Sequence, residues 1–420
     1  MVHDARYIAA NILNRLKLTA LQGEFCCYGT GDRLLLGIGR AASLTIVDQS
    51  SLDSVWRQID DFISAHGQDY IMGFLGFDPG NELARAIVSS RKRADLFVPE
   101  LVIECTRLDF KLLKGALPDA ADASTLDAAP DLEESPLDIA SLDEATADKG
   151  KYQQAVSAVL RAIRENRLER ATLARKIVSP WPFDLTKTLL ADNSLHALSR
   201  SFYFSNDCIA FAGQSPELLA DGTVDAFSTH KLSGTCAKQS GLTRQQLLDE
   251  FSMDPRIVAE HHSAIATIEQ HLNRLGAVDV DRFQIMDLPT LLHGWSRFTT
   301  RPVAGTRVAE CLRSIFPYGM NPVEVGFELL KAHEDFERGP YYGLVGCIQP
   351  DGQFTFSQVL RTAFTEEAGE GRSGSYVMVG AAITGLSTPE LELAETKTKL
   401  NAIRLYRAEQ GEHDSAHSSG

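Results

Sequence analysis

The sequence predicts an α/β protein of the α+β type, with large antiparallel sheets, and three observations lead to this expectation. Short runs rich in β-branched and aromatic residues, bounded by Gly, Asp and Pro, recur along the chain. Amphipathic helical patterns stand isolated between them. Regularly spaced strand–helix–strand crossovers, which a parallel sheet needs, are few. A chain of 420 residues is long enough to bury a large core.

The N-terminal third is expected to contain a helix followed by strands. Residues 1–18 have polar residues between their apolar ones, as in an amphipathic helix, and do not resemble a secretory signal. Strands are expected at 34–47, 70–77 and 94–105. No apolar stretch approaches the roughly 18 residues of a membrane-spanning helix. We therefore expect a cytoplasmic protein with no membrane partner.

The rest of the chain alternates in the same way. The expected elements, in order, are a helix at 150–166, strands at 171–178, 201–205 and 208–213, a helix at 255–274, strands at 341–348, 354–364 and 375–385, and a helix at 389–407.

One acidic segment divides the chain. Residues 116–148 contain ten acids and no base, which accounts for −10 of the net charge of −15. Such a composition buries too little apolar area to offset ordering entropy, so we expect a solvated spacer and not a docking tail. The expected organisation is an N-terminal part of the fold at 1–115, the acidic linker at 116–148, a C-terminal core at 149–408 and a disordered tail at 409–420.

Composition excludes several classes of function. With 41 basic and 56 acidic residues and no basic cluster, the chain is not expected to bind nucleic acid. The seven cysteines are scattered without a CxxC pair, so we expect free thiols and no disulfide framework or zinc site. Phosphate-binding GxxxxGK[ST], nucleophile-elbow GxSxG and HExxH patterns are absent from the sequence.

The expected last helix carries charge on the face that later becomes apolar. Ser387 is the expected N-cap, and Glu392, Glu395 and Lys399 share one face, which turns apolar by Tyr406. This pattern indicates charged groups that converge in a cleft. The alternative is a surface salt-bridge ladder between Glu395 and Lys399.

A second carboxylate lies on an apolar face in the helix expected at 255–274. Glu260 belongs to its apolar stripe, where a carboxylate is costly unless it is paired or bound to a cation. Glu260 and Glu395 together could hold a hard divalent ion such as Mg²⁺. The adjacent His261 and His262 point apart, so we expect one buried and one exposed histidine in place of zinc ligands.

Two further segments indicate a polar pocket on a sheet. Glu217 follows a strand and a turn that contains proline, and Gly234 and Thr235 allow close approach of the backbone to a ligand. Each segment alone is also compatible with an ordinary turn.

Taken together and in order, these segments resemble the chorismate-utilising enzymes, namely isochorismate, salicylate, anthranilate and aminodeoxychorismate synthases. The matching runs are ATLARK after Arg170, SPELL at 215–219, KLSGT at 231–235, DPRIVAEH at 254–261, LLHGWS at 291–296, FERGPYYGLVGCIQPDG at 336–352, LRTAF at 360–364 and VGAAITGLSTPELELAETKTKL at 379–400.

The resemblance implies the fold of anthranilate synthase component I, with two packed, mainly antiparallel β-subdomains flanked by helices. It implies chorismate as the small-molecule substrate. It also implies Mg²⁺ held by Glu260 and Glu395, with Glu392 supporting through water. The net charge of −15 makes a cation and local bases necessary for holding a dianion.

The resemblance also assigns roles to other residues. Arg361 and Tyr342 would grip the enolpyruvyl carboxylate, with Lys399 nearby. The catalytic residues would be Glu217, which protonates the leaving C4 hydroxyl, together with His293 and the residue at 170. Backbone groups that line the carboxylate sites would come from Gly234, Thr235, Gly380, Ala381 and Ala382.

Departures from the family pattern cluster at the reacting end. Arg170 stands where isochorismate and salicylate synthases have a lysine base, and arginine stays protonated at physiological pH. Ile257 replaces an acid three residues before Glu260, Ala382 replaces a glycine, and the segment 316–326 is shortened. We infer that the ligand grip is kept while the nucleophile step is altered.

Three functions are compatible with this pattern. The first is Mg²⁺-dependent conversion of chorismate to isochorismate, with or without continuation to salicylate and pyruvate. The second is an ammonia-using synthase of the aminodeoxyisochorismate or anthranilate type, which would need a separate glutaminase subunit. The third is a catalytically degenerate chorismate-binding protein.

Overall fold

A computed structural model describes residues 4–16, 18, 23–46, 52–77, 93–117, 135–146, 148–191, 199–238, 243–287, 291–367 and 373–408. The side chains of Thr235, Ala237, Arg256, Glu260, Leu291 and Ser373 are outside this description. The expected tail at 409–420 and most of the acidic linker also lie outside the described residues.

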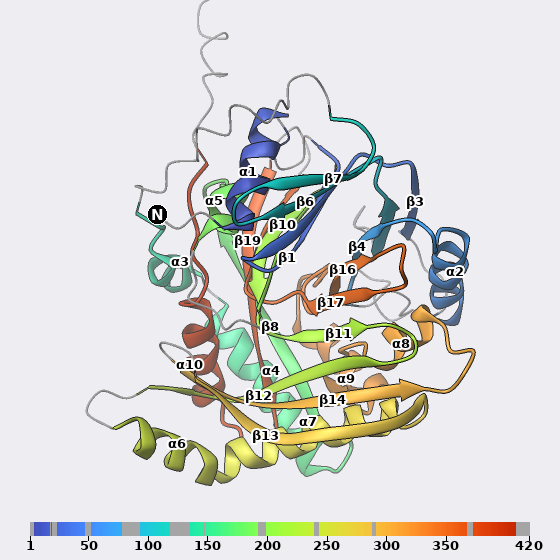
Figure 1. The fold of residues 1–420 in the computed structure, drawn as a ribbon. Coiled ribbons are helices and arrows are strands. Elements are labelled where there is room, and N and C mark those ends of the chain that lie inside the picture. The colour runs from blue at the N-terminus through green and yellow to red at the C-terminus, as the bar shows by residue number, and fades with distance from the viewer. Residues whose placement is uncertain are drawn as a thin grey trace, which may run out of the picture.

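The described strands form two antiparallel sheets, of ten and nine strands (Figure 1). The order of the first sheet is β15 (Met320–Asn321), β8 (Arg170–Ser179), β19 (Ser373–Ile383), β18 (Thr362–Glu367), β10 (Ile209–Ser215), β9 (Arg200–Ser205), β1 (Phe25–Gly29), β2 (Arg33–Ile38), β6 (Leu101–Thr106) and β7 (Phe110–Lys114).

The second sheet also mixes strands from both ends of the chain. Its order is β13 (Gly276–Asp287), β14 (Leu291–Pro302), β12 (Phe227–Ala237), β11 (Leu218–Gly222), β17 (Phe354–Gln358), β16 (Leu344–Ile348), β4 (Ile71–Leu75), β5 (Ala94–Val98) and β3 (Ala42–Ile46). The predicted α+β class is confirmed, and the N-terminal segment supplies strands to both sheets.

Aromatic side chains fill the space between the two sheets. The ring of Phe74 on β4 meets Phe204 on β9 at 4.9 Å and Phe211 on β10 at 5.5 Å, both edge to face. Each of these side chains is fully buried. Burial of a phenylalanine contributes about 1.5–3 kcal/mol, so this layer holds the sheets together.

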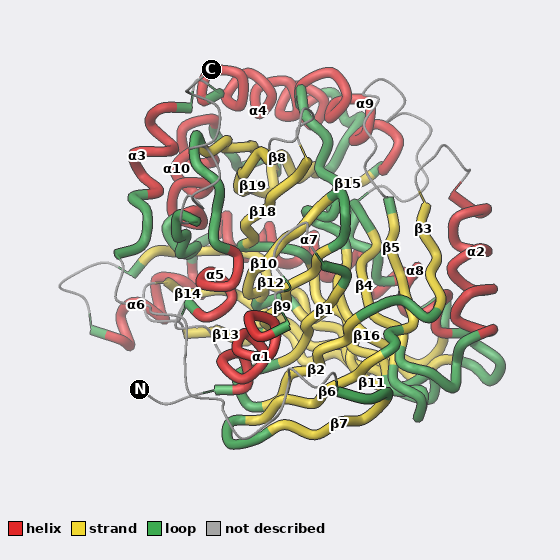
Figure 2. Tube along the Cα trace, turned by 90° about the horizontal axis from the view of Figure 1, so that it is seen from above, coloured by secondary structure: helices red, strands yellow, loops and turns green. Residues whose placement is uncertain are grey.

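Helices cover the outer faces of the sheets and one end (Figure 2). The first sheet is covered by α1 (Ala5–Arg15), α3 (Ile139–Ala145) and α5 (Leu185–Leu190), and the second by α2 (Leu52–Ala65), α7 (Pro255–Leu272) and α8 (Val308–Ser314). The others are α4 (Lys149–Arg164), which contacts α9 (Val323–His333) and α10 (Pro389–Leu400), and α6 (Arg244–Met253), which contacts α7.

Three segments expected as single strands are each two strands in different sheets. Residues 34–47 contain β2 and β3, residues 94–105 contain β5 and β6, and residues 354–364 contain β17 and β18. The prediction of one strand per run was therefore wrong. The composition stays strand-like across each break because each half pairs into one of the two packed sheets.

The last helix is shorter than expected and begins at a different cap. It ends at Leu400 and not near residue 407. The Oγ1 of Thr388 accepts the backbone N–H of Leu391 at 3.3 Å, whereas Ser387 accepts the N–H of Thr384. Thr388 is therefore the N-cap, and the expectation for Ser387 was wrong.

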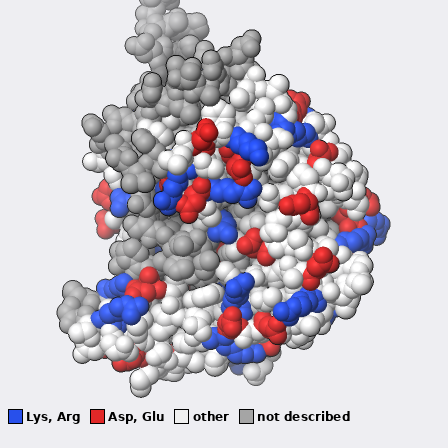
Figure 3. Space-filling model, in the orientation of Figure 1, with Lys and Arg blue, Asp and Glu red and all other residues white. Residues whose placement is uncertain are grey.

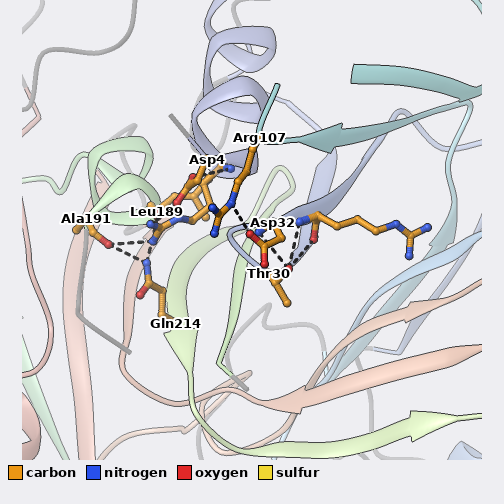
Figure 4. A network of polar contacts seen from close by, with 9 residues as sticks. Asp4, Thr30, Asp32, Arg107, Leu189, Ala191 and Gln214 are labelled. Atoms are coloured by element: carbon orange, nitrogen blue, oxygen red, sulfur yellow. Dashed lines mark hydrogen bonds and ion pairs between the residues drawn. The ribbon is translucent and has the colours of Figure 1, made fainter. Parts of the chain in front are cut away.

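Ionic contacts attach peripheral segments to the sheets. Part of the predicted linker forms α3, and Asp143 and Asp148 bind the fully buried Arg175 of β8 at 2.6 and 2.8 Å. Near the N-terminus, Arg6 donates to the carbonyl of Ala191 at 3.1 Å, beside the Gln214 contact to the same carbonyl (Figure 4). These contacts fix α3 and α1 against the first sheet.

Surface and thiol chemistry agree with the composition. On the face shown in Figure 3, basic and acidic side chains alternate without a basic patch. All seven cysteines are free, as predicted. Within the described part of the chain, no helix is long and apolar enough to span a membrane.

Candidate active site

A pocket opens where the two sheets meet α7 and the 314–320 segment. Its lining comes mainly from β8, β12, β14 and β19, from α7 and α10, and from the connections between strands. The predicted site residues that it contains are Arg170, Glu217, His293, Tyr342, Arg361, Gly380, Ala382 and Lys399. Residues far apart in the sequence therefore converge as expected.

Two of these residues lie where the chain passes from one sheet to the other. Glu217 connects β10 with β11, and Arg361 connects β17 with β18. The backbone of Glu217 accepts the N–H of Gln358 at 3.0 Å, which joins the two crossings. Arg361 has a φ of +51°, a conformation that costs energy for a residue with a side chain. Such strain is typical of functional positions.

Arg361 contacts His293 in the pocket. Its Nη2 donates to Nε2 of His293 at 3.0 Å. Burial, with the charges of Arg361 and Lys399, lowers the pKa of His293 well below its ordinary value, so the imidazole is neutral. Burial lowers the pKa of Arg361 to about 10, which leaves it charged at neutral pH. The pair therefore presents a desolvated positive charge.

The predicted backbone residues differ in their positions. Gly234, with a φ of +76°, lies at a bulge in β12, and a Cβ there would meet Ile257 at 2.6 Å. Its backbone hydrogen-bonds His293, so it orients that imidazole. Ala381 is fully buried outside the pocket lining, between the lining residues Gly380 and Ala382. The side chain of Thr235 lies outside the described residues.

Tyr342 is held by Thr172 of β8. Their hydroxyl oxygens are 3.0 Å apart, and Thr172 also donates to the carbonyl of Gly319 at 3.2 Å. Tyr342 has a φ of +68°. A Cβ on Gly319 would lie 2.8 Å from the Tyr342 hydroxyl, so the absent side chain leaves space for the ring.

A buried ion pair supports Tyr342 and Thr172 from behind. Arg338 donates to the carbonyl of Thr172 at 2.6 Å and pairs with Glu334 at 2.6 Å. Glu334 also accepts the N–H of Ala174, and the Arg338 guanidinium faces the Tyr342 ring. Sequence reasoning missed this pair, although Arg338 lies in the quoted FERGPYYG run.

Lys231 is a pocket residue that sequence reasoning missed. Its Nζ forms an ion pair with Oε1 of Glu217, and their side chains are 16% and 6% exposed. Burial opposes the charge of Lys231, but Glu217 outweighs burial and raises the pKa of the ammonium above its ordinary value. In the sequence, the available signal for Lys231 is its place as the first residue of the KLSGT run, three residues before Gly234.

Lys399 belongs both to the pocket and to an ion pair on α10. It contacts Glu395 at 2.8 Å and donates to the carbonyl of Gly380 at 3.0 Å. The expected salt bridge between Glu395 and Lys399 along α10 is therefore present. Because the same lysine also lines the pocket, the ion pair does not lie on a simple solvated face.

The predicted metal ligands are described only in part. Glu392 is 1% exposed, and the pKa of Tyr152 is raised well above its ordinary value by burial and by Glu392 and Glu395. Two neighbouring carboxylates in a buried setting have the oxygen-donor chemistry that Mg²⁺ prefers. The Glu260 side chain lies outside the described residues. Among described side chains, no group of three His, Cys, Asp or Glu could hold a metal.

The neighbouring histidines have separate environments, as predicted. His261 is fully buried, with Nε2 2.7 Å from Ser296 Oγ and Nδ1 3.1 Å from Ser233 Oγ, whereas His262 is exposed. Burial lowers the pKa of His261 to about 4. His261 is therefore a neutral structural histidine that links α7 to β12 and β14.

Comparison with known proteins defines the class. The sequence matches the family described as chorismate binding enzyme over residues 23–404, and the chain belongs to this family.

Two curated relatives carry different activities in their names. A salicylate synthase of Mycolicibacterium paratuberculosis is 26% identical over 64% of this chain and 60% of its own length. An anthranilate synthase component 1 of Haloarcula marismortui is 26% identical over 62% of this chain and 50% of its own length. The chain thus spans about half to three-fifths of these relatives.

Solved structures share the fold over most of the chain. MenF, the menaquinone-specific isochorismate synthase of Escherichia coli, has a TM-score of 0.68 at 22% identity and covers 90% of this chain and 88% of its own. Anthranilate synthase component I from Streptococcus pneumoniae has a TM-score of 0.67 at 17% identity, covering 88% and 91%. The predicted anthranilate synthase component I-like fold is confirmed.

Proposed function

We propose that this chain binds chorismate in the pocket and converts it to isochorismate, with elimination of pyruvate to give salicylate as a step that the same pocket allows. The observation that carries the proposal is the charge of the lining. Its described residues include four cationic side chains, Arg170, Lys231, Arg361 and Lys399, and one carboxylate, Glu217. A dianionic ring compound complements this surplus inside a chain of net charge −15.

The residues divide into a binding end and a reacting end. Arg361, with Tyr342 beside it, offers donors for the enolpyruvyl carboxylate, and Lys399 lies on α10 next to Gly380. The ion pair of Glu217 and Lys231 forms the proposed reacting end, where the C4 hydroxyl of chorismate would leave. Neutral His293 accepts from Arg361 and so fixes the direction of the guanidinium.

Mg²⁺ is the proposed cofactor, held by Glu395 and Glu260 with Glu392 supporting. When bound, it would neutralise a substrate carboxylate at the α10 side of the pocket. The buried position of Glu392 beside Glu395 supports this assignment.

A second candidate is favoured by Arg170. An arginine cannot take a proton from water at neutral pH, so a nucleophile that needs no base at this position would suit the site better. Ammonia, delivered by a separate glutaminase, is such a nucleophile. A third candidate function is binding of chorismate without turnover.

Product analysis distinguishes these functions. The purified chain is incubated with chorismate and Mg²⁺, with and without ammonium, and products are identified by chromatography and mass spectrometry. We expect isochorismate or salicylate without ammonium. An aminated product that forms only with ammonium would replace the first proposal by the second, and saturable binding without any product would leave a binding protein.

One variant sharpens the result. Arg170→Lys restores a group that can act as a base. If the water-activation step limits the native chain, turnover without ammonium rises in this variant. Unchanged turnover would show that residue 170 does not act on the nucleophile.

A further inference from the structure

Lys231 occupies a position that the family resemblance does not assign. It extends from β12 into the pocket and forms an ion pair with Glu217. The pocket lining around this pair also contains Arg170 and Arg361. The reacting end therefore contains a lysine and a carboxylate in direct contact.

This contact changes what Glu217 can do. Oε1 of Glu217 accepts from Nζ of Lys231, so the carboxylate is the acceptor of this contact and the ammonium is its donor. The ammonium of Lys231 carries three protons, and Arg170 does not release its own.

We propose that Lys231, and not Glu217, donates the proton to the hydroxyl that leaves chorismate, while Glu217 is the carboxylate that holds the ammonium in place. This inference rests on the proposed function. The ammonium keeps its proton in the resting pocket and releases it only when the departing oxygen becomes strongly basic.

The step balances as follows. The C4–O bond breaks with both electrons on oxygen, which takes a proton from Lys231 Nζ and leaves as water. The oxygen of an attacking water bonds to C2, and both ring double bonds move by one position. The proton of the attacking water passes to bulk water, and a proton from bulk water restores the Lys231 ammonium.

The test compares Lys231→Ala, Lys231→Met, Lys231→Arg and Glu217→Gln by kcat, KM and calorimetric binding of chorismate. We expect the Ala and Met variants to bind chorismate but to lose roughly 100-fold in kcat, a size typical of a lost general acid. Lys231→Arg should keep binding without restoring kcat, because arginine holds its protons. Ethylammonium added to Lys231→Ala should recover part of the lost kcat.

A matched control lies just beyond the same strand. Lys238 pairs with Asp287 and is not part of the pocket lining, so Lys238→Met should leave kcat unchanged. Thermal unfolding of each variant, followed by circular dichroism, checks that the fold is kept. Lys231→Met retains the aliphatic stem and serves if the alanine variant unfolds.

The outcomes separate this inference from the proposed function. Full kcat in Lys231→Ala, with activity abolished in Glu217→Gln, would overturn the donor role and restore Glu217 as the acid. Rescue by Lys231→Arg would reduce Lys231 to a binding charge. A wild-type chain that binds chorismate without turnover would also overturn the donor role. No chorismate binding by the wild-type chain would instead overturn the proposed function itself.

Discussion

Two half-buried arginines, Arg40 and Arg361, lie at equivalent places in the topology, since each connects a strand of one sheet with a strand of the other. Arg40 lies between β2 and β3. Its guanidinium contacts both oxygens of Asp95, at 2.6 and 3.0 Å, and faces the ring of Phe97. Asn206 donates to the same carboxylate at 2.7 Å. The charge of Arg40 is thus compensated within the fold.

Arg361 has a different environment. Its hydrogen-bond partner is neutral His293, and Glu217, the nearby carboxylate, is in an ion pair with Lys231. Burial opposes both guanidinium charges, but Asp95 holds the pKa of Arg40 above its ordinary value, while the pKa of Arg361 falls to about 10. The difference teaches that a charge in direct contact with a buried carboxylate stabilises the fold, whereas a pocket charge with no carboxylate in direct contact among the described residues is available to an anion.

The largest expected effect comes from neutralising each arginine. Arg361→Met should weaken chorismate binding by at least about 30-fold, since it removes a desolvated charged donor. Its free energy of unfolding should stay within about 1 kcal/mol of wild type, because no buried carboxylate loses its partner. Calorimetric titration and chemical unfolding measure the two quantities.

The matched variant Arg40→Met should show the opposite pattern. It leaves Asp95, which is fully buried, without its main counter-charge, so stability should fall by about 3–5 kcal/mol. Chorismate affinity of the folded fraction should be unchanged. Equal loss of binding in both variants would contradict the distinction between the two crossings.

The sequence predicted several of the residues that line the pocket but not how the chain brings them together. The crossing at Val359–Arg361 has no glycine or proline, and a positive φ at an arginine leaves no compositional signal. Lys231 was missed because its partner Glu217 is fourteen residues away, on a strand connection whose direction depends on the sheet switch. Glu395 and Lys399 were found because helical spacing alone places them together.

A second expected effect concerns the carboxylates of α10. Glu395→Gln should abolish the Mg²⁺ dependence of chorismate binding, because it removes a proposed ligand and the partner of Lys399. The matched control is Glu390→Gln, an exposed position on the same helix. Titrations with Mg²⁺ and with EDTA measure the effect. The same Mg²⁺ dependence in both variants would remove the metal assignment.

A smaller effect concerns the pH dependence of stability and comes from His261, a structural histidine outside the pocket lining. The folded pKa of about 4 lies below the ordinary 6.5, so the folded chain binds fewer protons than the unfolded chain between these values. The contribution of neutral His261 to the free energy of unfolding is complete above about pH 6.5 and is lost as pH falls toward about 4. Against the non-titrating His261→Asn, wild-type stability should fall by about 1–3 kcal/mol more across this window. Parallel stability–pH curves would contradict this.

The smallest expected effect is at Tyr342. Tyr342→Phe removes the hydroxyl that contacts Thr172, at a cost of about 0.5–1.5 kcal/mol, or roughly 2- to 12-fold in chorismate affinity. Tyr70→Phe, outside the pocket lining, serves as the control. A change of equal size in both variants would show that the hydroxyl is not part of the ligand grip.

The most direct test of the central claim is a calorimetric titration of the wild-type chain, in Mg²⁺, with chorismate and with benzoate. Two carboxylates should engage the cationic lining where one cannot, so we predict saturable chorismate binding that is at least about tenfold tighter than benzoate binding. Equal affinity for the two compounds, or no chorismate binding, would contradict the account of a pocket built for a dianionic ring.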